Sequence, residues 1–168
     1  MRRIACVSLP EIRVEIARER ERDAPRAIPL AIVVARPGST VRTERDVLGN
    51  TRLDVVSREA LALGVRPGQT VAAARAKHAE LHVRVVPEGA VRTALARIAE
   101  AALAFGPASA FDVATDVVWV DVGGCAHLHG GEAKMAASLA ARVAALGHAC
   151  RVAIADGPRI ASAVARFA

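Results

Sequence analysis

Three side chains that can ligate a metal lie close together in residues 123–131, which read GGCAHLHGG. Cys125, His127 and His129 carry the sulfur and imidazole donors that soft metals such as zinc prefer. Three donors at alternate positions rarely close a tetrahedral site alone, and no second Cys/His cluster exists in the sequence to complete it. No Gly-Lys-Ser/Thr follows the glycines, which excludes a Walker-type phosphate loop. We therefore expect a flexible strand-to-helix connection and no metal site.

Three aspartates, Asp112, Asp116 and Asp121, gather in a segment whose alternation predicts a β-hairpin. Two-metal phosphoryl transfer needs several carboxylates that converge on ions about 3.5–4 Å apart. Asp116 and Asp121 are separated by an odd number of positions, so on one strand they would point to opposite faces. The first predicted strand ends in VSLP, residues 7–10, and contributes no acid. The residues alone therefore indicate no complete catalytic centre.

Residues 57–78, SREALALGVRPGQTVAAARAKH, resemble a helix-turn-helix. A helix that reads DNA presents Arg, Asn, Gln or Lys near its start, because these side chains match the base edges. Here the second helix begins TVAAA at Thr70 and offers mainly methyl groups. We therefore expect two short packed helices, capped by Ser57 and Thr70, rather than a specific DNA reader.

The composition favours some classes of protein over others. A net charge of +6 and an isoelectric point near 10.5 favour a nucleic-acid partner, and a solvated arginine-rich surface explains them equally well. Aromatic residues make up only 2% of the 168 residues, which argues against modules that stack bases on Phe and Tyr. Trp119, the single tryptophan, is expected to pack in the core or, alternatively, to anchor an interface.

The sequence also favours one cellular compartment, the cytoplasm. No stretch approaches the ~20 apolar residues of a membrane span. The three cysteines include no Cys-x-x-Cys pair, as is typical of proteins in the reducing cytoplasm, so we predict a cytoplasmic location. The last predicted helix has no C-cap, and we expect these residues to be the N-terminal portion of a longer protein.

The hydrophobic pattern predicts strands that alternate with helices. Pro10 and Pro158 stand where first-turn prolines belong, and Gly64 and Gly147 are placed to end helices. This order predicts an α/β fold with helices on one face of a mixed sheet. The predicted strands are residues 3–8, 28–35, 52–56, 82–86, 109–113, 117–122 and 149–155, and the longer predicted helices are residues 11–22, 88–104, 132–146 and 158 onward.

Two motifs in this order resemble the Y-family (DinB-like) translesion DNA polymerases. Residues 57–68, SREALALGVRPG, resemble the family's fingers segment, Tyr-Glu-Ala-Arg-x-x-Gly-Val-x-x-Gly. Residues 118–122, VWVDV, resemble the palm strand that follows the family's Ser-x-Asp-Glu motif. The resemblance implies an α/β (α+β) fold, with a palm-like domain whose sheet is mixed or antiparallel and a small inserted fingers subdomain. It assigns residues 1–23 and 78–168 to the palm and 24–77 to the fingers, with the thumb, little finger and clamp-binding tail absent from this chain.

The same resemblance implies that most of the polymerase active site is missing. The first metal-binding Asp of the family falls on Ser8, and the second Asp of that motif falls on Pro10. In Ser-x-Asp-Glu, the Ser becomes Ala114, the Asp is retained as Asp116, and the catalytic Glu becomes Val117. We therefore expect no catalytic residues and no bound metal.

The nucleotide-binding positions implied by the resemblance are degenerate too. The triphosphate-binding Tyr and Arg of the fingers become Arg58 and Leu61. Where the family has Ser-x-Asn-Lys, this chain has residues 155–158, ADGP, so that Pro158 replaces the Lys. Four separately anchored losses indicate a pseudo-polymerase with no cofactor.

Residues 121–131, DVGGCAHLHGG, are similar to a non-catalytic branch of the family that belongs to a bacterial mutagenesis cassette. That branch tends to read Asp-Ile-x-Gly-Cys-Ala-His-Leu-Phe-Gly-Gly, so His129 takes the Phe position. The similarity implies a scaffold in SOS-induced translesion synthesis that docks the RecA-related protein ImuA, an error-prone C-family DNA polymerase and the sliding clamp. Two alternatives stay open: a weak polymerase that uses Asp116 with a displaced ligand such as Asp112, and a basic DNA-binding module.

Overall fold

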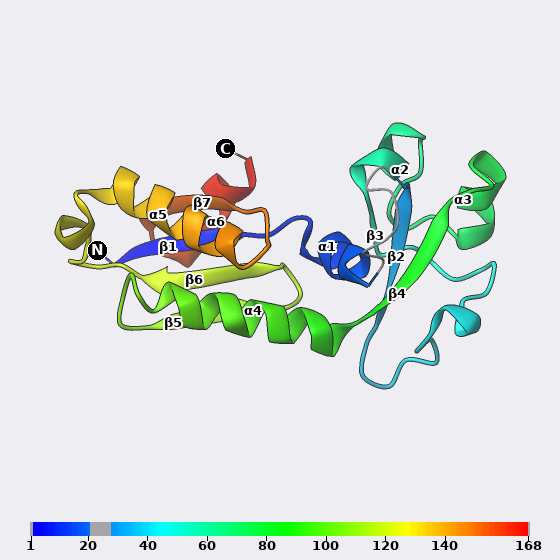
Figure 1. The fold of residues 1–168 in the computed structure, drawn as a ribbon, viewed down its shortest axis with the longest axis horizontal. Helices are drawn as coiled ribbons and strands as arrows, with labels where there is room; N and C mark the ends of the chain where they lie inside the picture. Colours follow the sequence, from blue (N-terminus) through cyan, green and yellow to red (C-terminus); the bar gives the residue numbers. More distant parts are fainter. Residues whose placement is uncertain (1, 21–27, 168) are drawn as a thin grey trace. The chain divides into compact units, whose positions relative to one another are not determined.

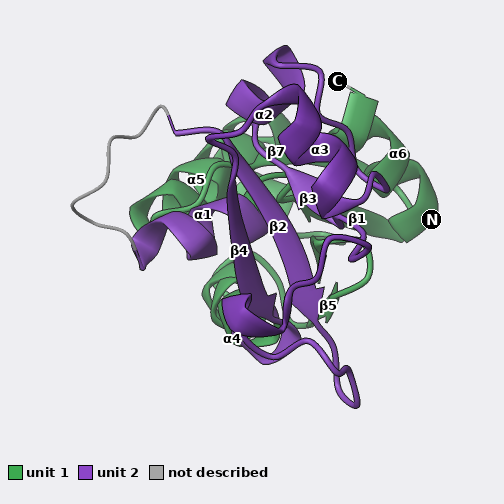
Figure 2. Ribbon diagram, turned by 90° about the vertical axis from the view of Figure 1, so that its right-hand side faces the viewer, with its two compact units in different colours: residues 1–12, 92–168 green, residues 13–91 purple. Residues whose placement is uncertain are grey.

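The computed structural model describes residues 2–20 and 28–167 (Figure 1). The chain forms two compact units, residues 1–12 with 92–168 and residues 13–91, which Figure 2 colours separately. We call them the first and the second unit. Their boundaries differ from the expected 23/24 and 77/78, because α1 (Ile12–Glu19) and β4 (His82–Pro87) lie largely in the second unit. The assignment of the units to palm and fingers stays a prediction.

The first unit is built on a four-stranded antiparallel sheet in the order β5-β6-β1-β7. Its central strand β1 (Arg3–Ser8) is buried from Ile4 onward, as expected of a strand covered on both faces. Strand β6 (Val117–Asp121) lies between β1 and β5 (Ser109–Asp112), and β5 and β7 (Arg151–Asp156) are the edge strands. The predicted hairpin of β5 and β6 is confirmed.

Helices cover both faces of this sheet, which differs from the expected arrangement on one face. Ala161 and Ala165 of α6 (Pro158–Phe167) pack on the face that carries Ile4, Cys6 and neighbouring apolar residues. The opposite face carries Arg3, whose side chain reaches α5 (Glu132–Ala145). Because β1 is apolar at successive positions, both of its faces need a cover.

The second unit contains a mixed three-stranded sheet in the order β3-β2-β4. Strand β2 (Leu30–Ala35) pairs in parallel with β4 and antiparallel with β3 (Val55–Val56). The predicted strand 52–56 is therefore shorter, and Arg52 makes only an isolated bridge to Thr70.

The two short helices predicted in the second unit are confirmed with both of their caps. Ser57 Oγ accepts from the Ala60 N–H at the start of α2 (Arg58–Ala62), and Thr70 Oγ1 accepts from the Ala73 N–H at the start of α3 (Val71–Lys77). Inward-facing residues of both helices join the core of this unit. A short 3-10 helix (Glu44–Asp46) completes it.

The remaining predictions agree to within a few residues. The predicted helix 88–104 is α4 (Glu88–Ala102), and the helix predicted at residues 11–22 runs over Ile12–Glu19, while positions 21–27 lie outside the described residues. Within the described part of the chain, no helix combines the length and apolar character needed to cross a membrane.

Candidate functional site

Ser8 and Val117 are direct cross-strand neighbours in the first unit. They pair in register at the end of the β1–β6 ladder, so both side chains lie on the face that α6 covers. Ser8 is 5% exposed and Val117 is fully buried. The structure thus brings together two of the predicted degenerate catalytic positions.

Asp116 lies beside them in the turn between β5 and β6. Its backbone has a φ of +53°, in the left-handed region that Asp tolerates better than most residues. Its carbonyl accepts a hydrogen bond from the Leu9 N–H at 3.0 Å, which ties the turn to the end of β1. Because Asp116 lies in the turn rather than on β6, strand alternation does not force its side chain and that of Asp121 to opposite faces, in contrast to the expectation from the sequence.

Asp112 shapes the same turn. One carboxylate oxygen accepts from the Ala114 N–H at 3.0 Å, and the other accepts from the Thr115 hydroxyl at 2.6 Å. The Thr115 hydrogen bond is the main reason that the pKa of Asp112 is lowered from its usual value. Both carboxylate oxygens of Asp112 therefore stabilise the turn of the β5–β6 hairpin.

The predicted nucleotide positions divide between the two units. Pro158 is the exposed first residue of α6 in the first unit. Arg58 and Leu61 lie on α2 in the second unit, and both are exposed.

The Cys/His segment forms an ordered turn rather than a flexible connection. Residues Ala126–His129 make a 3-10 helix that ends at Gly130, whose φ of +75° is left-handed. The His129 ring stacks on Phe105 with ring centroids 5.0 Å apart, and Cys125 Sγ approaches the Gly123 carbonyl at 3.6 Å. Nowhere in residues 2–20 and 28–167 do three His, Cys, Asp or Glu side chains form a group that could hold a metal ion.

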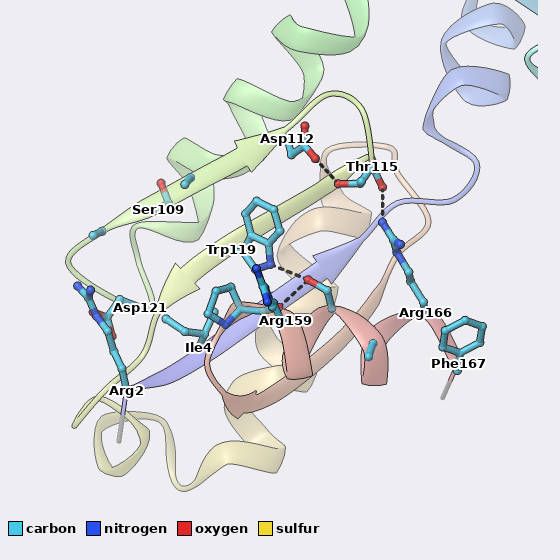
Figure 3. A pocket seen from close by; sticks show the side chains of 15 residues that line it. Arg2, Ile4, Ser109, Asp112, Thr115, Trp119, Asp121, Arg159, Arg166 and Phe167 are labelled. Atoms are coloured by element: carbon cyan, nitrogen blue, oxygen red, sulfur yellow. Dashed lines mark hydrogen bonds and ion pairs between the residues drawn. The ribbon is translucent and has the colours of Figure 1, made fainter.

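A pocket of about 750 Å³ opens between β6 and α6 in the first unit (Figure 3), and we call it the Trp119 pocket. Its apolar lining includes Ile4, Ala110, Trp119 and Ala163. Trp119 also packs against the apolar cluster under α6, so it belongs partly to the core and partly to a surface.

A hydrogen-bonded chain fixes the orientation of Trp119. Its indole N–H donates to Ser162 Oγ at 2.8 Å, and the Ser162 hydroxyl donates to the Pro158 carbonyl at 2.7 Å. Burial raises the pKa of the Cys6 thiol, so the thiol stays protonated and also donates to Ser162 Oγ, at 3.5 Å. The indole is thus held in one orientation at the wall of the Trp119 pocket.

Charged side chains surround this apolar lining. Arg2 pairs with Asp121 at 2.6 Å, and this hydrogen bond is the main cause of the lowered pKa of Asp121. Arg166 donates to the Thr115 carbonyl at 3.4 Å beside Asp112. For Arg159, which also lines the pocket, there is no hydrogen-bond or ion-pair partner among the described residues.

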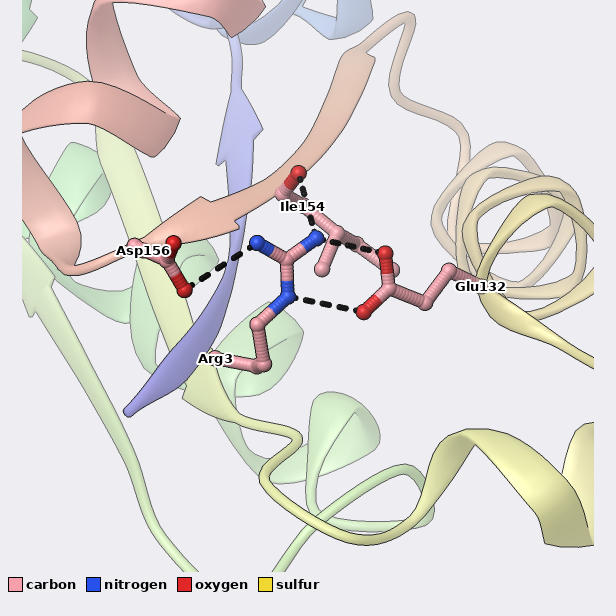
Figure 4. Close-up of polar contacts among 4 residues, drawn as sticks. All are labelled: Arg3, Glu132, Ile154 and Asp156. Atoms are coloured by element: carbon pink, nitrogen blue, oxygen red, sulfur yellow. Dashed lines mark hydrogen bonds and ion pairs between the residues drawn. The ribbon is translucent and has the colours of Figure 1, made fainter. Parts of the chain in front are cut away.

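A second polar cluster lies on the α5 side of the sheet (Figure 4). The Arg3 guanidinium donates to both carboxylate oxygens of Glu132, at 2.8 and 2.5 Å, and to Asp156 at 3.2 Å. These hydrogen bonds raise the pKa of Arg3 and lower that of Glu132. The cluster joins β1, β7 and α5 in a structural role.

No sequence motif marks the Trp119 pocket. Ile4, Trp119 and Ala163 are far apart in the chain, and only the register of β1 on β6 and the docking of α6 bring them together. The available indication was that Trp119 alternates with buried Val118 and Val120 on one strand.

The sequence comparisons place the chain among known proteins. A model of the family described as impB/mucB/samB matches residues 16–166. Protein ImuB from two strains of Caulobacter vibrioides is 39% identical over 105 residues, which cover 62% of this chain and 23% of each relative. The chain therefore matches less than a quarter of the length of these curated relatives.

Solved structures confirm the predicted fold class. DinB from Sulfolobus solfataricus superposes with a TM-score of 0.71 at 14% identity, over 98% of this chain and 45% of that one. An insertion ternary complex of Dbh DNA polymerase gives a TM-score of 0.70 at 14% identity, with the same two coverages. At this identity the likeness concerns the fold. Together with the sequence matches, it confirms the resemblance that the motifs indicated.

Proposed function

Because this chain belongs to the impB/mucB/samB family, we propose that it is a polymerase-like module of the ImuB type that does not transfer nucleotides. Its role is to dock partner proteins during translesion DNA synthesis in the SOS response. The observation that carries the proposal is the pair Ser8 and Val117, which are cross-strand neighbours and which the resemblance to the Y-family motifs aligns with carboxylates.

The donor set does not fit two divalent ions. Asp116 supplies the one carboxylate among the three motif positions, Ser8 offers a buried hydroxyl, and Val117 offers no donor. Two-metal sites use several carboxylates to balance the charge of the ions and to stabilise the attacking and leaving oxygens. Without them, the transition state loses stabilisation of several kcal/mol, so we expect no nucleotidyl transfer.

The alternative of a weak polymerase needs Asp112 as a displaced ligand. Both of its oxygens accept hydrogen bonds within the β5–β6 turn, which tie the orientation of this carboxylate to the hairpin. This favours the scaffold over the polymerase. The DNA-binding alternative rests on the net charge of +6, and salt-dependent binding to duplex DNA would support it.

The proposed partners are those implied by the ImuB likeness: the RecA-related protein ImuA, and, through a longer form of the protein, an error-prone C-family polymerase and the sliding clamp. Retention of ImuA by this chain in a pull-down is the expected result. Retention by a C-terminal fragment of the protein but not by this chain would contradict the docking role.

Catalysis is tested by primer extension with Mg²⁺ or Mn²⁺, using this chain and any longer natural form of it. We expect no extension above a protein-free control. Extension that disappears in an Asp116→Asn variant, and persists in a matched Asp156→Asn variant away from the turn, would contradict the proposal.

A further inference from the structure

The Trp119 pocket has the composition of a protein-docking site. Its lining is mainly apolar and includes two aromatic residues, Trp119 and Phe167, and arginines lie around it. Tryptophan and arginine are the residue types that most often carry binding energy at protein interfaces, where an apolar centre is enclosed by a polar rim. The indole is already held by Ser162, so little side-chain entropy is lost when a partner covers it.

The charges around the pocket indicate what an occupant must carry. The Asp121 carboxylate is satisfied by Arg2 and by the Gly123 N–H, and the Asp112 carboxylate by Thr115 and Ala114. Arg159 alone among these side chains lacks a polar partner in the part of the chain that the structure describes. A carboxylate on the occupant would therefore form an ion pair with Arg159, whereas a cationic occupant would be repelled by it.

We infer that the Trp119 pocket binds a short peptide segment of a partner protein, with an apolar side chain against Trp119 and a carboxylate at Arg159. This deepens the proposed docking function and rests on it.

A nucleic-acid strand fits these observations less well. Each nucleotide carries a phosphate, and single-strand grooves combine a continuous positive track with several aromatic stacking faces. Here the lining offers two aromatic side chains, Trp119 on β6 and Phe167 at the end of α6, and Asp112 and Asp121 interrupt its arginines. Asp112 and Asp121 stand near opposite ends of β6 (Figure 3), where they would face the phosphates of any strand that ran along the pocket.

The test uses the whole 168-residue chain and a phage-displayed library of random peptides of about twelve residues. Trp119 is the only tryptophan, so peptides without tryptophan report directly on the pocket through its fluorescence. We expect recovered peptides to be enriched in Asp or Glu near a large apolar residue. We also expect their binding to shift the Trp119 emission.

Two variants block the pocket without touching the core. Ala163→Phe fills it from an exposed helix position, and Arg159→Glu reverses the unpaired charge. Each should weaken peptide binding by about tenfold or more, because a central contact or charge pair is lost. The matched controls are Ala137→Phe and Arg142→Glu, at exposed positions of α5 outside the pocket, and they should bind like the parent.

Three results would overturn the inference. The first is that the recovered peptides show no enrichment in carboxylates. The second is that the blocked variants and the controls bind the peptides with equal affinity. The third is that single-stranded oligo-dT shifts the Trp119 emission and displaces the peptides. Any of them would leave the proposed function standing, because primer extension and ImuA retention decide that separately. Primer extension by a chain that still binds acidic peptides at the pocket would overturn the proposed function alone.

Discussion

The indole N–H of Trp119 on β6 and the hydroxyl of Ser162 on α6 meet at 2.8 Å, 43 positions apart in the chain. This contact joins the sheet to the helix at the wall of the Trp119 pocket. The same hydroxyl donates a hydrogen bond to the Pro158 carbonyl at the start of α6. One small side chain thus links the strand, the helix and the first turn of that helix.

Ser162→Ala should lower the free energy of unfolding by about 1 kcal/mol, because the indole N–H loses its acceptor in a partly buried place. It should also change the Trp119 emission. The measurement is urea denaturation followed by circular dichroism, with Ser138→Ala on the exposed side of α5 as the control. A loss no larger than that of the control would show that the hydrogen bond contributes little.

His129 and Phe105 form the second aromatic contact that can be tested. The rings stack with centroids 5.0 Å apart and planes inclined by 26°. His129→Ala should cost about 0.5–1.5 kcal/mol of stability beyond the loss of buried area, as aromatic pairs do. His129→Phe keeps an aromatic ring at this site and should be close to neutral. Thermal unfolding of both variants is the measurement, and equal melting temperatures would contradict the role of the stack.

Gly106 is required by a close backbone approach. A Cβ at this position would lie 1.8 Å from the Asp121 carbonyl oxygen, so backbone atoms would have to move. Gly106→Ala should therefore destabilise the chain by several kcal/mol or prevent folding. Gly89→Ala is the matched control, because a Cβ there meets nothing within 4 Å, and on α4 it should be neutral or stabilise by up to about 1 kcal/mol.

Acid stability should depend on the pair Arg3 and Glu132. Arg3 holds the pKa of Glu132 below its ordinary value of 4.5 in the folded state. The stabilisation is therefore fully present above about pH 4.5 and is lost as the pH falls through the lowered pKa, where the folded carboxylate takes up its proton. Glu132→Gln should flatten the pH dependence of stability in that acid range. Glu100→Gln, on exposed α4 surface, is the control and should leave the slope unchanged.

Much of the secondary structure could be predicted from the sequence, because local patterns determine it. The capping side chains of Ser57 and Thr70 predicted where their helices begin, and the apolar alternation around Trp119 predicted a hairpin. Which strands share a sheet was harder to predict, since β4 pairs with β2 in the second unit and only tertiary contacts decide this. The Trp119 pocket and the Arg3 cluster were missed for the same reason: each unites residues more than 100 positions apart.

Restoring the carboxylates tests the proposed loss of metal binding directly. Ser8 and Val117 pair across β1 and β6 next to Asp116, so Ser8→Asp with Val117→Glu places three acids at one end of the ladder. Without metal, these acids repel one another, and two of them replace buried side chains, so the double variant should be less stable than the parent. Mn²⁺ should raise its melting temperature, because a ligand that binds only the folded state at 100 times its Kd adds about 2.7 kcal/mol. The parent should show no such shift, and adding Asp116→Asn should remove it from the double variant. An equal Mn²⁺ shift in the parent would mean that Ser8, Asp116 and Val117 do not mark a lost metal site.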